Sequence, residues 1–328
     1  MKKTLIAALL LAAVMLLGGC KGKENNGNGA SSNPMSGPES KVESGISSML
    51  PESSEPQANS LPESSGSAES GPASQADNLP ANAVSIDADS LAQTDFSAFS
   101  NDTVTWGPGH AMDDQNRPTA CVQLQEKYGG DGALFIQADT DEKAMCLTFD
   151  EGYENGYTPA ILDVLKEKDC PAVFFVTMPY VKSNPELIQR MIDEGHVVGN
   201  HSTHHPSEGM QSLSPEDMIA DLAELHNYMV ENFNYQMTYF RPPAGLFSER
   251  SLEIAKSLGY TSVLWSFGYY DYNPAEQPDP AAALEKVTAM AHPGGIPLLH
   301  AVSKTNPEIL GQAIDNWRDA GYTLAKLQ

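Results

Sequence analysis

The sequence predicts an α/β fold in which about seven mostly parallel strands form a barrel-like or open sheet, preceded by a disordered segment. Two observations predict this class. From residue 144 onward, apolar runs of strand length alternate with helix-length periodic segments, as in β–α units of a parallel sheet. No Phe, Trp or Tyr occurs before Phe96, and all 25 aromatic residues lie from there on. A segment without aromatic residues buries little apolar surface, so the first third is not expected to form a core.

The first 20 residues have the pattern of a secretory signal. Two lysines precede an apolar run that ends at Leu17, and Gly-Gly-Cys20 follows it. The run is shorter than the about 20 apolar residues of an ordinary membrane-spanning helix. Leu17-Gly-Gly-Cys20 resembles a bacterial lipobox, in which the cysteine becomes lipidated. We therefore expect 1–20 to be a lipoprotein signal peptide, with an uncleaved anchor or a plain signal peptide as the alternative.

The next segment reads as a tether. Residues 21–95 are rich in Ser, Gly, Pro, Asn and Glu, and the sequence Leu-Pro-Glu-Ser-Ser occurs twice in them. Such low-complexity sequence predicts a disordered linker, with a root-mean-square span of roughly 50 Å. Residues 96–142 form a transitional extension that is expected to pack on the edge of the domain at 143–328. The protein is thus expected to be exported and held by its lipid at the outer face of the bacterial cytoplasmic membrane.

Charge and cysteine usage narrow the possible partners. The net charge of −24 disfavours nucleic acid and anionic membrane surfaces, so contact with the membrane is expected through the lipid anchor alone. The sequence indicates no protein partner. Beyond Cys20, the cysteines Cys121, Cys146 and Cys170 form no Cys-x-x-Cys pattern, and the last two are interpreted as small core residues.

The regular part of the chain carries repeated helix boundary signals. Helical segments begin with a capping residue before Pro, as in Ser214-Pro215 and Asn306-Pro307. Others end at a glycine, namely Gly195, Gly259 and Gly321. The predicted strands between these helices are 144–149, 172–177, 196–200, 237–241, 262–266, 295–300 and 322–327.

Polar side chains with chemical capability stand at the carboxyl ends of five predicted strands. In parallel α/β folds the active site lies at that edge of the sheet. The spacing therefore predicts that these side chains meet. They are Asp150, His201, Arg241, Asp271 and His300.

Two of these positions indicate a metal site. In His201-Ser-Thr-His-His205, two histidines four residues apart can meet one ion if the backbone turns once between them, as on a helix face. His204, at a spacing of three, is the competing partner. In Asp150-Glu151, one carboxylate can ligate a divalent ion while the other accepts a proton from water. A solvated acidic turn is the alternative for this pair.

The remaining positions suggest acid–base chemistry. Arg241-Pro-Pro-Ala-Gly245 ends a strand with a fixed cation that can hold a carboxylate ionised, and a backbone N–H in its turn could serve an oxyanion. His300 ends an apolar strand, and Asp271 could raise its pKa so that it acts as a general acid. A structural arginine and a satisfied core histidine are the alternatives. His196, His226 and His292 are interpreted as structural or surface residues.

Together these segments resemble the polysaccharide deacetylase domain, also called the NodB-homology domain or carbohydrate esterase family 4. Its five motifs occur in order over about residues 144–327. The resemblance implies a distorted (β/α) barrel and one divalent metal ion, usually zinc. The motifs are Thr148-Phe-Asp-Glu-Gly152, His201-Ser-Thr-His-His205, Arg241-Pro-Pro-Ala-Gly245, Asp271-Tyr272 and Leu298-Leu-His300.

The extended first motif, which runs to Thr158, and His300-Ala-Val-Ser303 are similar to the delta-lactam-biosynthetic de-N-acetylases. That subgroup removes acetyl groups from N-acetylmuramic acid in peptidoglycan. The resemblance also implies roles for individual residues. These are Asp150 as general base, Arg241 as its orienting partner, His201 and His205 as metal ligands, Ala244 N–H in the oxyanion site, Leu298 in the acetyl pocket, and His300 as general acid tuned by Asp271.

Two residues depart from the family pattern. The family usually has Asp as third metal ligand where this chain has Glu151, and the subgroup often has Asn there. The aromatic residue of the fourth motif is usually Trp and is Tyr272 here, which concerns the sugar platform. The predicted function is metal-dependent deacetylation of peptidoglycan sugars. The alternatives are a deacetylase of chitin-like or xylan-like polymers, or a non-catalytic glycan-binding lipoprotein.

Overall fold

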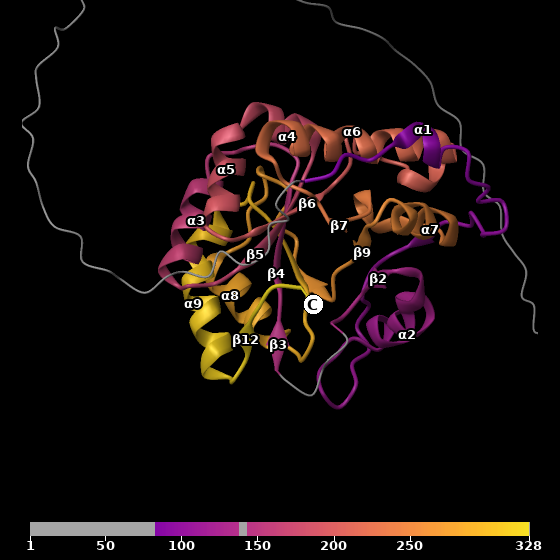
Figure 1. Cartoon of the computed structure of the whole chain (residues 1–328). Coiled ribbons are helices and arrows are strands. Elements are labelled where there is room, and N and C mark those ends of the chain that lie inside the picture. Colours follow the sequence, from indigo (N-terminus) through magenta and orange to yellow (C-terminus); the bar gives the residue numbers. More distant parts are fainter. Residues whose placement is uncertain (1–82, 138–142, 328) are drawn as a thin grey trace, which may run out of the picture. The chain divides into compact units, whose positions relative to one another are not determined.

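An eight-stranded sheet, parallel at every pairing, forms the centre of the molecule (Figure 1). The computed structural model describes residues 83–137 and 143–327. The predicted parallel α/β fold is confirmed. In sheet order the strands are β10 (Phe267–Gly268), β11 (Pro297–His300), β4 (Leu147–Glu151), β5 (Ala172–Val176), β6 (Val197–Asn200), β7 (Tyr239–Phe240), β9 (Thr261–Val263) and β2 (Ala133–Leu134).

One short stretch of chain links the two sides of this sheet. β9 pairs with β7 and β2. Three residues separate it from β10, which pairs with β11. Between them, the N–H of Leu264 donates to the carbonyl of Leu134 at 2.7 Å, and that of Ser266 donates to Ile296 at 2.9 Å. The predicted strand 262–266 is thus split as it crosses from one side to the other. The sheet curls as a distorted, incompletely closed barrel.

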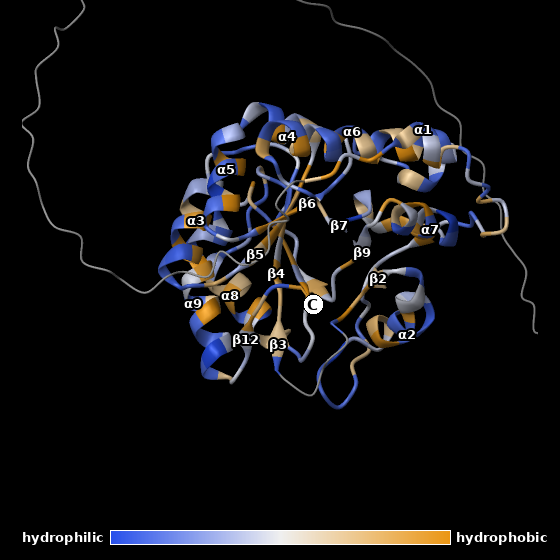
Figure 2. Ribbon diagram, viewed as in Figure 1, coloured by the Kyte–Doolittle hydropathy of each residue, from blue (hydrophilic) through white to orange (hydrophobic). Residues whose placement is uncertain are grey.

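Helices cover the outside of the curled sheet (Figure 1). Their apolar positions face inward, and Figure 2 shows apolar colours on the strands and mixed colours on the helices. This arrangement explains the uninterrupted burial of β4 and β5, since a parallel strand inside such a sheet is covered on both faces. β5 is accordingly apolar throughout, whereas β4 also buries polar residues at its carboxyl end. The helices are α3 (Thr158–Glu167), α4 (Met178–Ser183), α5 (Pro185–Asp193), α6 (Pro215–Phe233), α7 (Glu249–Ser257), α8 (Pro280–Ala289) and α9 (Thr305–Asp319).

The boundary signals read from the sequence are mostly reproduced. Gly195, Gly259 and Gly321 follow α5, α7 and α9 with φ of 80°, 86° and 86°, a region that favours glycine. The hydroxyl of Ser214 caps α6 by accepting from the N–H of Asp217 at 3.1 Å. The predicted cap at Asn306 is wrong, because α9 begins one residue earlier and the Asn306 side chain is engaged elsewhere.

The segment 96–137 packs on the barrel, as expected, and also extends it. It contains β1 (Val104–Thr105), α2 (Thr119–Tyr128), a short 3₁₀ turn (Gly129–Asp131) and β2. β1 pairs antiparallel with β8 (Leu246–Phe247), and Trp106 donates from its indole N–H to the carbonyl of Trp265 at 2.9 Å. β2 supplies an edge strand that the sequence did not predict. The last predicted strand is present as β12 (Thr323–Leu324), but it pairs only with β3 (Ala144–Met145).

Residues 83–95 correct the predicted extent of the linker, because they are structured. They include α1 (Ala88–Leu91), which packs on α6. The side-chain amide of Asn227 bonds both backbone groups of Ile86, at 2.7 and 3.0 Å, and His226 Nε2 lies 3.0 Å from the carbonyl of Val84. We call residues 83–91 the strap. Its contacts give His226 the structural role expected for it.

The signal peptide, Cys20 and the rest of the predicted linker lie outside the described residues. Among the residues that are described, no helix is long and apolar enough to cross a membrane. Cys121, Cys146 and Cys170 are buried free thiols, and burial raises the pKa of each to about 12. All three therefore belong to the core, as proposed for Cys146 and Cys170.

Candidate active site

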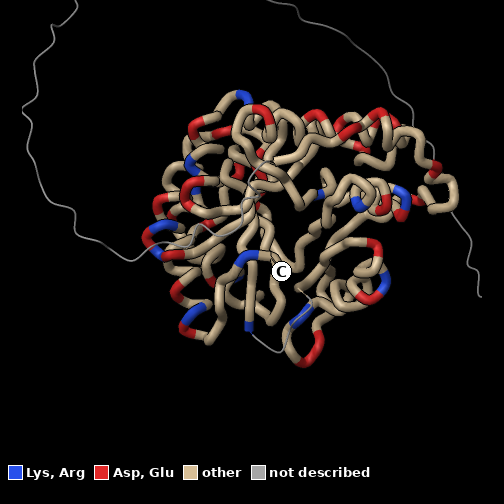
Figure 3. Tube along the Cα trace, in the orientation of Figure 1, with Lys and Arg blue, Asp and Glu red and all other residues tan. Residues whose placement is uncertain are grey.

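Strand pairing brings the predicted site residues to one edge of the sheet. β11 lies beside β4 with His300 opposite Asp150 and Leu298 opposite Thr148. His201 directly follows β6, and Arg241 directly follows β7. Figure 3 shows that charged residues lie mainly on the helices and loops around the sheet. Asp150 and Arg241 differ from these residues, because both are buried at the strand ends.

Asp150 and Arg241 form a buried ion pair. Arg241 Nη1 donates to Asp150 Oδ1 at 2.7 Å, and the guanidinium also donates to the carbonyls of Val263 and Leu264 at 3.0 and 3.3 Å. Its plane covers the ring of Phe175, 4.2 Å from the ring centre. Burial acts to raise the pKa of Asp150, but the charge of Arg241, the neighbouring His201 and His300 and the hydrogen bond from Arg241 together outweigh it, and the pKa is lowered. Asp150 is thus an ionised, oriented carboxylate with its second oxygen free of the arginine.

That second oxygen faces the first histidine of the His-x-x-x-His motif. His201 Nε2 lies 3.5 Å from Asp150 Oδ2. His201 Nδ1 lies 2.9 Å from the carbonyl of Arg241, which can only accept, so Nδ1 carries the proton and Nε2 keeps its lone pair. Burial lowers the pKa of His201 to about 4. His201 is therefore neutral at neutral pH, in the form that binds metals.

The second histidine reaches the same place through a loop rather than a helix. The ring centres of His201 and His205 lie 4.8 Å apart at a steep angle. In this loop the backbone of Ser202 and His205 is left-handed, with φ of 71° and 46°. The Ser202 hydroxyl accepts a hydrogen bond from the N–H of His205 at 2.7 Å. Left-handed backbone at non-glycine residues is strained and persists only when the surroundings fix it. The single turn expected between the two imidazoles is therefore made, but not on a helix face.

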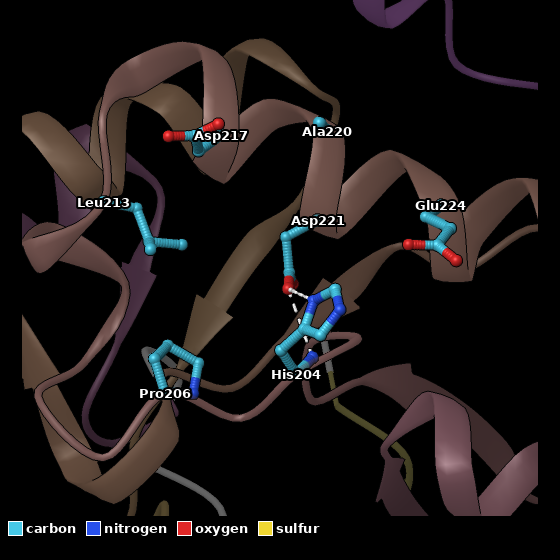
Figure 4. Close-up of a pocket in the computed structure, with 7 residues that line it drawn as sticks. All are labelled: His204, Pro206, Leu213, Asp217, Ala220, Asp221 and Glu224. Carbon is cyan, nitrogen blue, oxygen red and sulfur yellow. Dashed lines mark hydrogen bonds and ion pairs between the residues drawn. The ribbon is translucent and has the colours of Figure 1, made fainter.

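Asp221 of α6 fixes this loop and removes the competing histidine. One oxygen of Asp221 accepts from the N–H of Thr203 at 2.9 Å, and the other lies 2.8 Å from His204 Nδ1. Figure 4 shows His204 turned toward α6, in a surface pocket that also contains Leu213 and Glu224. His204 is thus held away from His201. The ambiguity between spacings of three and four is resolved in favour of His201 and His205 as the paired imidazoles.

His300 and Asp271 form the second polar pair. The carboxylate of Asp271 bonds both Nδ1 and the backbone N–H of His300, each at 2.8 Å. Burial acts to lower the pKa of His300, but the hydrogen bond and negative charge of Asp271 outweigh it and the pKa is raised. His300 therefore holds a proton more strongly than a free histidine, with its Nε2 left to deliver that proton.

Two residues that support this pair were missed by sequence reasoning. Asn306 donates from its amide to Asp271 Oδ2 at 2.7 Å and to the carbonyl of His300 at 2.9 Å. Tyr269 in turn donates its hydroxyl to the amide oxygen of Asn306. Because Asn306 precedes a proline, its sequence context indicated a helix cap. No sequence signal distinguishes the two uses.

Glu151 does not join the two histidines. It is fully buried, and neither carboxylate oxygen has a hydrogen-bond partner. Burial, together with Glu154 and Asp150, raises its pKa well above the usual value, so the neutral form is favoured. Glu151 and Asp150 are adjacent on β4, and neighbouring strand residues point to opposite faces. The structure thus separates the two carboxylates that the sequence placed in one site.

The substrate-pocket candidates stand at the same edge. Ala244 is exposed in the turn after Arg241, with a left-handed φ of 56°. Leu298 is half-buried on β11, two residues before His300. Tyr272 is 56% exposed, and its ring centre lies 5.8 Å from that of His300. All three are therefore placed where they could border a substrate held between Asp150 and His300.

The imidazoles of His201 and His205 fit a divalent ion by their chemistry, since both are nitrogen donors and His201 is held in the ligating tautomer. The predicted carboxylate ligand does not fit, because Glu151 is buried apart from them. In the described part of the chain, no group of three or more His, Cys, Asp and Glu side chains could hold a metal ion. The donors that the described residues offer are thus a pair of imidazoles.

The fold and this edge of the sheet define a polysaccharide deacetylase, and the chain belongs to that family. Residues 137–263 match the family model described as polysaccharide deacetylase. The chain is 41% identical over 235 residues to the peptidoglycan-N-acetylmuramic acid deacetylase PdaA of Bacillus subtilis. The matched region covers 70% of this chain and 86% of that protein.

Two further comparisons agree. The solved structure of B. subtilis PdaA, a family 4 carbohydrate esterase, superposes with a TM-score of 0.64 at 40% identity, over 68% of this chain and 94% of that one. The peptidoglycan-N-acetylglucosamine deacetylase PgdA of Listeria monocytogenes is 31% identical over 180 residues, which is 55% of this chain and 37% of that protein. This chain is thus a family 4 carbohydrate esterase, and the expectation of an enzyme is confirmed.

Proposed function

We propose that this enzyme removes the N-acetyl group from N-acetylmuramic acid residues of peptidoglycan. The observation that carries the chemistry is the facing pair of Asp150 and His300 across β4 and β11, one holding a negative charge and the other a proton. Amide hydrolysis needs both, since water must lose a proton and the departing amine must gain one. The relative named for N-acetylmuramic acid supports the choice of sugar.

The two sides of the site divide the reaction between them. Asp150, fixed by Arg241, takes the proton from the attacking water as it adds to the acetyl carbon. The N–H of Ala244 donates to the oxygen that becomes negatively charged. His300 then gives its proton to the sugar nitrogen as the carbon–nitrogen bond breaks, and acetate leaves. Leu298 lines the space for the acetyl methyl group.

We propose that His201 and His205 hold one divalent ion, with zinc as the expected metal. A bound divalent ion would polarise the acetyl carbonyl and lower the pKa of its water. Family 4 deacetylases are generally metal-dependent, and the tautomer fixed by the Arg241 carbonyl leaves His201 ready to ligate. Glu151 takes no part in this proposal.

The chemistry can be tested on purified peptidoglycan by measuring released acetate. Asp150→Asn keeps the shape of the side chain but removes the base, so we expect the rate to fall by about 100-fold or more. His204→Gln is the control, since this histidine lies in the loop of His201 and His205 but faces Asp221. Equal acetate release by the wild type and Asp150→Asn would end the proposal.

The choice of sugar needs a separate measurement. Mass spectrometry of digested product would show whether the free amine lies on muramic acid or on glucosamine. A free amine on muramic acid stands close to the lactyl carboxyl of the same sugar and could close to the muramic δ-lactam. Acetate release from chitin-like or xylan-like chains, but not from peptidoglycan, would favour the broader alternative. Binding without any release would favour a non-catalytic role.

We also propose that the protein is exported and anchored by a lipid on Cys20 at the outer face of the cytoplasmic membrane. The sequence of residues 1–20 supports this location, which places the domain beside the cell wall. Metabolic labelling with a fatty acid analogue tests it. A Cys20→Ala variant should lose the label, and a labelled variant would contradict the assignment.

A further inference from the structure

Three exposed aromatic side chains lie on loops that follow strands of the site. Among the described residues five large apolar side chains are exposed, and three of them, Tyr153, Tyr270 and Tyr272, follow these strands. Tyr153 follows β4, and the other two follow β10. Apolar surface left in water is unfavourable, and a group of such residues beside a reactive site indicates a contact surface.

Tyr270 and Tyr272 form a pair. Their ring centres lie 4.6 Å apart with an angle of 62° between the planes, and the rings are 45% and 56% exposed. Asp271, between them in sequence, is fully buried and bonds His300. The alternation of outward, inward and outward side chains therefore presents both rings to solvent while the middle residue holds the proton donor.

The loop that carries the rings is braced, so the rings are presented in a fixed arrangement. The side chain of Gln277 donates to the carbonyl of Asn273 at 2.7 Å and accepts from the Ser303 hydroxyl at 2.9 Å, which ties the loop to the segment after β11. The amide of Asn273 also donates to the Tyr270 hydroxyl at 3.3 Å. A surface ordered before binding loses less conformational entropy when its ligand arrives.

We propose that Tyr270, held against Tyr272, binds the sugar ring next to the one that is deacetylated, and so selects a glycan chain over a short fragment. One face of a pyranose ring is lined by C–H groups, which pack on the electron-rich face of an aromatic ring. Because the two planes meet at 62°, the pair cannot stack flat on one sugar. Tyr272 lies against His300 and borders the reacting sugar, while Tyr270 lies one ring further out and is free to contact its neighbour.

This inference rests on the proposed function only for the location of the reacting sugar near His300. It adds a requirement on chain length, because Tyr270 has nothing to bind in a substrate that ends at the reacting sugar. It also places the discriminating interaction on Tyr270 rather than on Tyr272. A change at Tyr272 would disturb His300 directly, whereas Tyr270 has no contact with His300 among the ring pairs and hydrogen bonds of the site.

The test compares kcat/KM on soluble peptidoglycan disaccharide, in which the reacting muramic acid is the terminal sugar, and on tetrasaccharide, in which an inner muramic acid has a neighbour on both sides. Chitobiose and chitotetraose form a second pair. For the wild type we expect the tetrasaccharide to be preferred. In Tyr270→Ala the ratio of tetrasaccharide to disaccharide should fall by about tenfold, through KM rather than kcat. Tyr270→Phe keeps the ring and should keep the ratio. Tyr322→Ala removes a tyrosine from the opposite edge of the sheet, before β12, and should leave the ratio unchanged.

An equal loss on both lengths in Tyr270→Ala, or no loss on either, would overturn the inference, as would a wild type without length preference. Failure of the proposed function has a different signature. In that case peptidoglycan fragments release no acetate, while the ratio measured on the chitin-derived pair still depends on Tyr270. Thermal unfolding of each variant shows whether the comparison concerns folded protein.

Discussion

At the scale of single residues, the site works by giving two ionisable groups opposite environments. Asp150 faces the fixed charge of Arg241, and His300 faces the carboxylate of Asp271. The pKa of Asp150 is lowered from 3.8 and that of His300 is raised from 6.5. Ionised Asp150 and protonated His300 therefore coexist over the whole interval between the two pKa values.

This pairing predicts the pH dependence of the reaction. His300 must be protonated to act as an acid, so kcat/KM should fall as the pH rises through its raised pKa. In Asp271→Asn the negative charge is lost, burial then dominates, and the pKa of His300 falls. We expect the alkaline limb to move to lower pH, so that kcat/KM on that limb falls below the wild-type value. The measurement is kcat/KM against pH for both proteins.

Asn306→Ala provides the comparison for that experiment. It removes two donated hydrogen bonds but keeps the charge of Asp271. It should lower kcat by loosening the pair without moving the limb to lower pH. An alkaline limb at the same pH in the wild type and in Asp271→Asn would show that His300 is not the titrating acid.

Sequence reasoning located most of these residues because strand ends are recognisable. Asp150, His201, Arg241 and His300 each follow an apolar run, and parallel pairing brings such ends together. The interpretation of Glu151 as a partner of the histidines overlooked a rule available from the sequence. Adjacent residues on one strand face opposite sides, so Asp150 and Glu151 could share a site only if β4 ended between them. β4 includes both.

At the scale of elements, β6 positions the site through the absence of a side chain. A Cβ at Gly199 would lie 2.6 Å from the ring of Phe175, and that ring supports the guanidinium of Arg241. Gly199 thus leaves the space that the Phe175 ring occupies beneath the guanidinium of Arg241.

Gly199→Ala is therefore expected to destabilise the protein by about 1–3 kcal/mol and to lower kcat, because Phe175 must move and Arg241 with it. Urea denaturation and acetate release measure the two effects. Gly311→Ala on α9 is the matched control, since its Cβ would meet only ordinary contacts at 3.5 and 3.6 Å. It should stabilise the helix by up to about 1 kcal/mol. Equal stability of both variants would contradict the packing argument.

The elements themselves were predictable in proportion to their length. The long runs that became β4, β5 and β11 were found within a few residues. β2 and β10 have two residues each, which is too short for any periodicity to appear. They are recognisable only through their pairing partners, β9 and β11. The choice between a barrel and an open sheet depends on both strands, so it could not be made from the sequence.

At the scale of the whole molecule, the strap joins the N-terminal part of the chain to the helical layer. Its contacts use backbone groups of Val84 and Ile86 with side chains of α6, and Leu91 packs on the core. The sequence could not predict this, because residues 83–91 contain no aromatic residue and their partners, His226 and Asn227, lie more than 130 positions away.

A chain that begins at Ala83 should unfold at the same urea concentration as one that begins further upstream. A chain that begins at Asp95 should lose about 1–3 kcal/mol, since the apolar surface of α6 and the side chains of His226 and Asn227 become exposed. The activity on a disaccharide should be kept in both chains, because the strap touches none of the site residues. No difference in stability between the two would show that the strap contributes nothing to folding.

The strap also has a mechanical consequence. Any pull on the chain upstream of Ala83 acts first on the hydrogen bonds that join Ala83, Val84 and Ile86 to α6 and the residue after it, on the outer helical layer. Load is thus taken up at α6 and is not passed directly to the strands that hold Asp150 and His300. If the domain is held from this end by the proposed lipid anchor, a force on the N-terminal segment would leave the distance between Asp150 and His300 unchanged.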